Sequence, residues 1–482
     1  MQVHASILGA VMIASAFLVH PLEAGEVAAQ TRAHEPRNAT RGPLRVHPKN
    51  PRYFADRGGK LVFLTGSHTW GNLQDYTYAS KRSPAPMNFA DYLKFLISNN
   101  HNFIRLWTWE SPVNRNASQS TITYQPMPYD RPGPGLGADG KPWFDLRRFN
   151  QVYFDRLRNR VAEARDQGVY VAVMLFQGFS IEGKGNVGGD PWRGHPFHPG
   201  NNVNGIDGGG RLLHTLANRA VTDLQEAYVR KVIDTVNELN NVLYEISNED
   251  RGSLADTDWQ YHMIRFIKRV EAARPWQHPV GMTAQWPDGA SLAESPADWI
   301  SPAERFPVSD GRKVVINDTD HSYFWIQLKA DGIAAQRAWV WKNFLSGNQC
   351  LFMDPYLDPD HDHDPGRNDP REARPDPYWE PLRQALGQTR HWASRIDLAN
   401  MVPHPELASS RWCLANPGTE YLVNLPRGKD LQLDLRTAPG PFRAEWINPA
   451  NGRLIPGMPI TGRARRTVEP PFEGDAILHL AR

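Results

Sequence analysis

Eight short apolar runs alternate with longer amphipathic segments along most of the chain. The runs are Lys60–Gly66, Asn102–Trp109, Val169–Phe176, Asn241–Ser247, Pro279–Ala284, Asp298–Ser301, Lys313–Asp318 and Cys350–Pro355. Continuous apolar runs are typical of parallel strands whose outer face is covered. Segments with helical periodicity separate most of them, and examples are Asn88–Asn99, Leu146–Gly168 and Gln327–Gly347. This alternation predicts an α/β fold, a (β/α)₈ TIM barrel with loop insertions, in preference to an open doubly wound sheet.

The sequence changes character near Asn400. Short runs such as "EYLVNL", "LQLDLR" and "AILHLA" follow one another there, separated by turns rich in Pro, Gly and Asn. This spacing is typical of a small antiparallel β-sandwich. We therefore expect a barrel domain over residues 44–398 and a C-terminal β-sandwich domain over residues 400–482.

The first 29 residues have the pattern of a secretory signal peptide. An apolar run from Ala5 to Val19 precedes Pro21 and small residues, and it is shorter than the roughly 20 residues that cross a bilayer. Cleavage after Ala24 or Ala29 would give a secreted or periplasmic protein with no membrane attachment, whereas retention as an anchor is the alternative interpretation.

The numbers of charged residues and cysteines limit the classes of partner and cofactor that we expect. The 54 Lys+Arg nearly balance the 52 Asp+Glu, and this balance argues against a nucleic-acid or anionic-membrane partner. Cys350 and Cys413 could pair in an exported protein, or they could remain two isolated thiols. The Asp/His-rich stretch Asp358–Pro365 matches no calcium loop, so we expect no metal and no cofactor. The sequence makes no prediction of oligomeric state.

Polar and aromatic residues gather where the expected strands end, which is the active-site end of such a barrel. We expect the substrate-binding residues to come from these ends: His68, Trp70, Gln74, Arg105, Trp107, Gln177, Asn248, Trp286, His321, Tyr323 and Asp354. Hydroxyl groups of a sugar bind to polar side chains of this kind, and its C–H faces stack on tryptophan. The predicted partner is therefore a carbohydrate.

Two carboxyl groups that flank a glycosidic bond can hydrolyse it. Glu249 follows the fourth expected strand, while Asp318 ends the seventh and Asp320 comes two residues later, on the opposite side of the barrel mouth. We predict Glu249 and one of these aspartates as the catalytic pair, with a slight preference for Asp320. Glu245 lies in the middle of its strand, and we expect it to be a buried partner of Arg105 or His321.

The motif "YEISNE" (Tyr244–Glu249) resembles the fourth-strand motif of cellulase-like clan A glycoside hydrolases. The segments "HPVGMT", "NDTDH" and "FMDPY" are similar to those of secreted bacterial apiosidase-like proteins, and "EWINPANGR" resembles a C-terminal domain labelled collagen-binding. The resemblance implies Glu249 as general acid/base, Asn248 as a partner of a sugar 2-hydroxyl, and Arg105 as the residue that orients the nucleophile.

The chain departs from this family at the seventh strand, where the family carries a glutamate nucleophile and this sequence has "NDTDH". A glycoside hydrolase, retaining by analogy, is the favoured hypothesis. The shorter aspartate arm leaves the stereochemical outcome open. This aspartate also supports a second hypothesis, in which the chain is a catalytically inactive barrel that binds glycan or extracellular matrix.

Overall fold

The computed structural model describes residues 40–78, 86–115, 121–183, 189–284, 290–356, 376–425 and 430–482. The expected signal segment (residues 1–29), Trp286 and the stretch Asp358–Pro365 lie outside the described residues. Within the described ranges, no helix combines the length and apolarity needed to cross a bilayer.

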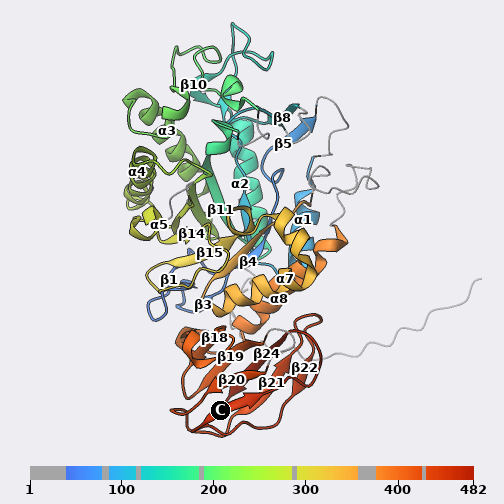
Figure 1. Ribbon diagram of the computed structural model, residues 1–482. Helices are drawn as coiled ribbons and strands as arrows, with labels where there is room; N and C mark the ends of the chain where they lie inside the picture. The colour runs from blue at the N-terminus through green and yellow to red at the C-terminus, as the bar shows by residue number, and fades with distance from the viewer. Residues whose placement is uncertain are drawn as a thin grey trace, which may run out of the picture. The chain divides into compact units, whose positions relative to one another are not determined.

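Eight parallel strands close into a barrel, as the alternation predicts (Figure 1). In chain order they are β4 (Thr65–His68), β6 (Phe103–Leu106), β11 (Tyr170–Gln177), β12 (Val242–Asn248), β13 (Val280–Thr283), β14 (Trp299–Ser301), β15 (Val314–Asp318) and β16 (Gln349–Met353). Pairing of β16 with β4 and of β4 with β6 completes the ring. The (β/α)₈ fold is thereby confirmed.

Helices cover the outside of the barrel. They are α1 (Phe89–Ser98), α2 (Gln151–Asp166), α3 (Arg219–Val236), α4 (Leu254–Glu271), α5 (Ala290–Glu294), α7 (Trp325–Leu345) and α8 (Glu380–Ala393). The short helix α6 (Thr319–Ser322) instead follows β15 directly, at the carboxyl end of that strand. Side-chain oxygens of Asn150, Asn218 and Ser253 accept backbone N–H groups at the starts of α2, α3 and α4, as N-cap residues do. Positive φ at Gly332 interrupts α7.

The first barrel strand begins later than predicted. Leu61–Val62 (β3) instead belongs to a separate antiparallel sheet with β1 (Arg45–Val46) and β2 (Phe54–Ala55). Between that sheet and the barrel, the backbone N–H of Leu64 donates to Gln349 Oε1 at 2.7 Å. The apolar run therefore serves two sheets, and a side chain satisfies the backbone where it passes from one to the other.

Two further predicted boundaries are wrong. The second barrel strand ends at Leu106, because Asn72 Oδ1 and Gln74 Oε1 accept the N–H groups of Trp107 and Trp109 in place of a neighbouring strand. The segment predicted as helical from Leu146 begins as strand β10 (Asp145–Phe149), which pairs with β9 (Tyr129–Asp130). Strands β5 (Asp75–Tyr78), β7 (Val113–Arg115) and β8 (Thr121–Gln125) form another small sheet.

The C-terminal part consists of antiparallel sheets. The larger has the order β17 (Val402–Pro403), β18 (Cys413–Asn416), β19 (Glu420–Leu425), β24 (Ala476–Ala481), β21 (Arg443–Ile447) and β22 (Leu454–Pro456), and β20 (Leu431–Asp434) pairs with β23 (Arg465–Val468). Leu422 and Ile477 from the larger sheet share a buried cluster with Trp341 and Phe344 of α7. Of the two interpretations for the cysteines, the structure has the isolated thiols: Cys350 and Cys413 are both free and buried.

Candidate active site

A pocket of about 900 Å³ opens at the carboxyl end of the barrel. Residues that follow five neighbouring strands line it, namely Gly178 after β11, Glu249 and Asp250 after β12, Ala284 after β13, Ala303 after β14, and Asp320 and His321 after β15. The short loop from β12 to α4 adds Arg251, Gly252 and Ser253, and the segment around Arg211 and His214 forms a further wall. This is the end of the barrel at which the sequence places the site.

Glu249 occupies this pocket with an unusual backbone. Its φ is +54°, a left-handed conformation that costs free energy in a residue other than glycine and is often found at functional sites. Close approach of Gly178 accompanies this turn, because a Cβ at that glycine would lie 2.6 Å from the carbonyl oxygen of Glu249 and from Oδ1 of Asp250. The backbone of η1 (Gly178–Ser180) therefore packs directly against the loop that carries Glu249.

The residue before Glu249 is fixed by one side chain from β11 and one from α6. Asn248 Nδ2 donates to Gln177 Oε1 at 3.2 Å, and Asn248 Oδ1 lies 2.7 Å from His321 Nε2. The backbone N–H of Gln177 in turn donates to Glu110 Oε2 at 2.6 Å. These contacts bring the predicted residues Gln177, Asn248 and His321 together beside Glu249.

The residue after Glu249 is fixed by a buried ionic cluster. His214 Nδ1 lies 2.7 Å from Asp250 Oδ1, and its Nε2 lies 3.3 Å from Glu110 Oε2. The imidazole stacks on Trp259 with 4.3 Å between ring centroids. Burial lowers the pKa of His214, but the carboxylates of Asp250 and Glu110 outweigh this effect and raise the pKa to about 10. Burial likewise opposes ionisation of Glu110, but His214 and then His195 lower its pKa to about 2.

Asp318 is enclosed at the end of β15. It is fully buried, and it accepts from Arg105 Nη1 at 2.5 Å and from the backbone N–H of Asp320 at 3.1 Å, with His68 Nε2 at 3.4 Å. Burial raises the pKa of this carboxyl, but the charge of Arg105 outweighs it and holds the pKa well below the usual range. Asp318 is thus an ionised carboxylate that caps α6 and does not line the pocket.

Arg105 joins Asp318 to the barrel interior, since its Nε donates to Glu245 Oε2 at 2.7 Å. The expectation that Glu245 is a buried partner of Arg105 is confirmed. Burial raises the pKa of Glu245 to about 7, although the Arg105 charge opposes this increase. The ordinary cost of an unpaired buried carboxylate is offset by this pairing.

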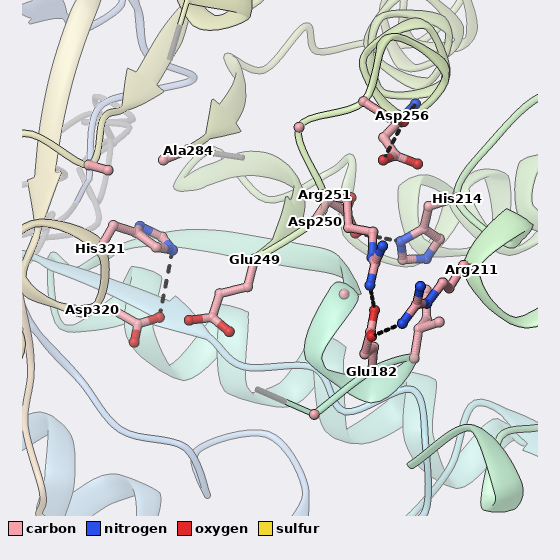
Figure 2. Close-up of a pocket in the computed structure, with 16 residues that line it drawn as sticks. Glu182, Arg211, His214, Glu249, Asp250, Arg251, Asp256, Ala284, Asp320 and His321 are labelled. Atoms are coloured by element: carbon pink, nitrogen blue, oxygen red, sulfur yellow. Dashed lines mark hydrogen bonds and ion pairs between the residues drawn. The ribbon is translucent and has the colours of Figure 1, made fainter. Parts of the chain in front are cut away.

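Asp320, in contrast, lines the pocket together with Glu249. Its carboxylate and that of Glu249 point toward one another (Figure 2). His321 Nε2 lies 3.7 Å from Asp320 Oδ2 as well as close to Asn248. Of the two aspartates left open by the sequence, only Asp320 is placed where a bound molecule could contact it together with Glu249.

The remaining predicted residues lie around the site without lining the pocket. His68 stacks on Trp107 with 5.3 Å between centroids, and Trp70 packs against Trp107. Gln74 is buried, and its side-chain amide makes hydrogen bonds to the backbone of Trp109 and Pro126.

Two further predicted residues form polar contacts with other side chains. The hydroxyl of Tyr323 donates to a carboxylate oxygen of Asp331 at 2.5 Å. Asp354 is a buried bidentate partner of Arg383, with both contacts at 2.7 Å. Asp354 and Gln74 therefore support the fold.

Sequence reasoning missed several pocket residues: Glu182, Arg211, His214, Asp250 and Arg251. Glu182, Arg211 and His214 belong to the long insertion between β11 and α3, whose course no periodicity predicts. Asp250 and Arg251 directly follow Glu249, so their proximity to it was the one available signal. Among the described residues, no group of three or more His, Cys, Asp or Glu side chains could hold a metal ion.

One protein-family model matches part of the chain. A family model described as a domain of unknown function, DUF6298, matches residues 111–285, a range that includes His214 and Glu249. Among curated proteins, none matches.

Similar solved structures cover nearly the whole chain. One described as "Glycoside hydrolase" has a TM-score of 0.58 at 13% identity, over 92% of this chain and 97% of its own. A glycoside hydrolase family 5 structure from Bacteroides vulgatus has a TM-score of 0.57 at 12% identity, over 91% and 93% of the two chains. A second Bacteroides vulgatus structure, described provisionally as a glycoside hydrolase, has a TM-score of 0.62 at 13% identity, over 92% and 82%. At such identities the likeness establishes the shared fold.

Proposed function

We propose that this chain is a glycoside hydrolase in which Glu249 and Asp320 are the catalytic carboxyl pair. One observation carries the proposal: the two side chains follow the carboxyl ends of the fourth and seventh barrel strands, line one pocket and point toward one another (Figure 2). Two carboxyl groups that face each other across a cleft are the arrangement that hydrolysis of a glycosidic bond requires. The similarity in fold to glycoside hydrolases supports the same activity.

In the proposed reaction Glu249 donates its proton to the glycosidic oxygen as the bond from that oxygen to the anomeric carbon breaks. A carboxylate oxygen of Asp320 forms a bond to the anomeric carbon. Water then gives a proton to Glu249 and displaces Asp320, which releases the sugar with its anomeric configuration retained. Arg105 and Asp318 contribute indirectly, because the Asp318 carboxylate accepts the N–H of Asp320 and so fixes the start of α6.

The substrate and the location are parts of this proposal. The apiosidase-like resemblance favours a side chain of a plant or microbial polysaccharide, or an oligosaccharide derived from one. The signal-like pattern of residues 1–29 favours export to the periplasm or the medium. Collagen binding by the C-terminal sheets rests on the resemblance of Glu445–Arg453 alone.

The proposal is tested by incubating the protein with a broad panel of plant and microbial glycans and measuring the reducing ends that are released. We expect the wild-type protein to cleave at least one glycan, and Glu249→Gln to lose about 10²–10⁴-fold of that activity, the usual contribution of general acid–base catalysis. Leu254→Ala, a change on an 85% exposed side chain near the pocket loop, is the control. A wild-type protein that binds a glycan as tightly as Glu249→Gln does, with no cleavage by either, would instead establish the inactive glycan-binding barrel.

A further inference from the structure

Two arginines from different segments meet at one side of the pocket. Arg211 lies in η3 (Gly210–Leu212), and Arg251 follows Glu249 by two residues. Nη2 of Arg211 contacts Oε1 of Glu182, and Nη2 of Arg251 contacts Oε2 of the same carboxylate. Figure 2 shows this group on the side of the pocket away from Asp320, with Glu249 between. The two guanidinium groups are thus held at a spacing that fits one carboxylate.

This group is open to solvent. The side chains of Arg211, Arg251 and Glu182 are 65%, 49% and 35% exposed. Ion pairs with this exposure contribute little net stability, so a carboxylate from a ligand can compete with Glu182 at small cost. Two cations around one anion also leave an excess of one positive charge.

The other cation on this side of the pocket, His214, lies between two carboxylates, and these three groups together carry a formal charge of −1. The charge of His214 is shared between Asp250 and Glu110, both of which are in contact with its imidazole. Arg211 and Arg251 are therefore the groups that attract an anion at this end, while Glu249 and Asp320 form the anionic end. Guanidinium groups recognise carboxylates in particular, because their planar N–H forks match the two oxygens.

We propose that Arg211 and Arg251 form a subsite for the carboxylate of a uronic acid, so that the substrate is an acidic glycan cleaved next to, or within a few units of, that residue. The inference rests on the proposed glycoside hydrolase activity. Glu182 holds the position of the ligand carboxylate and competes with it. Because of this competition, mutations on the two sides of the ion pair change the binding affinity in opposite directions. Removing the charge of Glu182 strengthens binding of acidic glycans, whereas removing either arginine weakens it.

Binding without turnover tests the subsite separately from the activity. Calorimetry with Glu249→Gln protein would compare oligogalacturonates and other uronic-acid oligosaccharides with carboxyl-reduced counterparts prepared from each of them. We expect the acidic member of at least one pair to bind about tenfold more tightly, the equivalent of one charge-assisted contact. We also expect this preference to decrease with added salt.

Variants in the same background identify the groups responsible. Arg211→Gln and Arg251→Gln should each remove most of the acidic preference, and Glu182→Gln should increase it. Arg312→Gln is the matched control, because Arg312 contacts Asp310 and Glu294 just before β15, at the opposite end of the barrel. Equal binding of acidic and reduced glycans, or an acidic preference that survives both arginine changes, would overturn the subsite. Either result leaves the hydrolysis experiment to decide the proposed function by itself.

Discussion

The backbone N–H of Asp320 donates to Oδ1 of Asp318 at 3.1 Å, so one aspartate of "NDTDH" holds the other in place. Asp318 is buried against Arg105 and His68, whereas Asp320 lines the pocket. The two residues therefore have different surroundings even though they lie two positions apart, and the role that we propose for each makes its own prediction.

Asp318→Asn should destabilise the protein, and Asp320→Asn should not. Loss of a buried charge partner costs about 3–5 kcal/mol, and we expect the lower end because Arg105 keeps its contact with Glu245. For Asp320→Asn we expect a change below about 1 kcal/mol, with hydrolysis abolished. Denaturant unfolding and activity assays on both variants measure the contrast. The assignment is wrong if Asp318→Asn is as stable as the wild type and Asp320→Asn retains full activity.

Gly178→Ala should reduce turnover by displacing Glu249. The added Cβ would lie 2.6 Å from backbone and carboxylate atoms of the Glu249–Asp250 turn, and a shift of about 1 Å at a reacting group can cost roughly 10²-fold in rate. Steady-state kinetics should show the loss in kcat. Gly58→Ala is the control, because a Cβ at Gly58 meets only an Asp56 carboxylate oxygen at 3.3 Å. A Gly178→Ala protein with unchanged kcat would mean that the tight turn does not position the acid.

The charge of His214 should make stability depend on pH in the alkaline range. Because its pKa is raised from 6.5 to about 10 by Asp250 and Glu110 against the effect of burial, the stabilisation is complete below about pH 6.5 and is lost as pH rises toward 10. His195, also in contact with Glu110, has a pKa lowered by burial, so its titration does not contribute to this dependence in the alkaline range. We expect His214→Gln to cost about 3–5 kcal/mol near neutral pH.

Urea unfolding of wild type and His214→Gln between pH 6 and pH 10 measures this difference, which should shrink as the pH increases. His262→Gln is the matched control, since His262 contacts the single carboxylate of Glu226 on the outer helices and not in the pocket. A stability difference that stays constant across this range would show that His214 is not held protonated.

The C-terminal sheets and the barrel should unfold together. Leu422 of β19 is fully buried in a cluster with Trp341 and Phe344 of α7, so Leu422→Ala should cost about 2–5 kcal/mol. Met458→Ala, at an 85% exposed position of the same part, should have almost no effect. Calorimetry should give one transition that shifts in Leu422→Ala. Two transitions, with only the smaller one shifted, would instead indicate independent domains.

The barrel could be predicted because each buried parallel strand leaves a continuous apolar run, and the eight runs are separated by helical periodicity. The prediction was least accurate at Lys60–Gly66 and Asn102–Trp109, where side chains of Gln349, Asn72 and Gln74 replace strand partners. These side-chain hydrogen bonds come from residues that are distant in sequence, so no local pattern reveals them.

The position of Glu249 could be predicted from its place after a buried strand, and so could the existence of a carboxylate across the barrel. The choice between Asp318 and Asp320 could not, because it depends on where β15 ends and α6 begins. The positions of His214 and Arg211 in the pocket could not be predicted either, for a different reason. They lie in a long insertion, and only tertiary structure brings them beside Asp250 and Arg251.

The central claim is that Glu249 supplies the proton and Asp320 attacks the anomeric carbon. The most direct test is the kcat/KM of Glu249→Gln on two glycosides of the sugar that the glycan panel identifies, one with a dinitrophenyl and one with an alkyl leaving group. A dinitrophenolate leaves without protonation, so this account predicts a loss of about 10²–10⁴-fold on the alkyl glycoside and a much smaller loss on the aryl glycoside. Asp320→Asn should lose activity on both. Equal losses for Glu249→Gln on the two glycosides, or wild-type rates on the alkyl glycoside, would contradict the account.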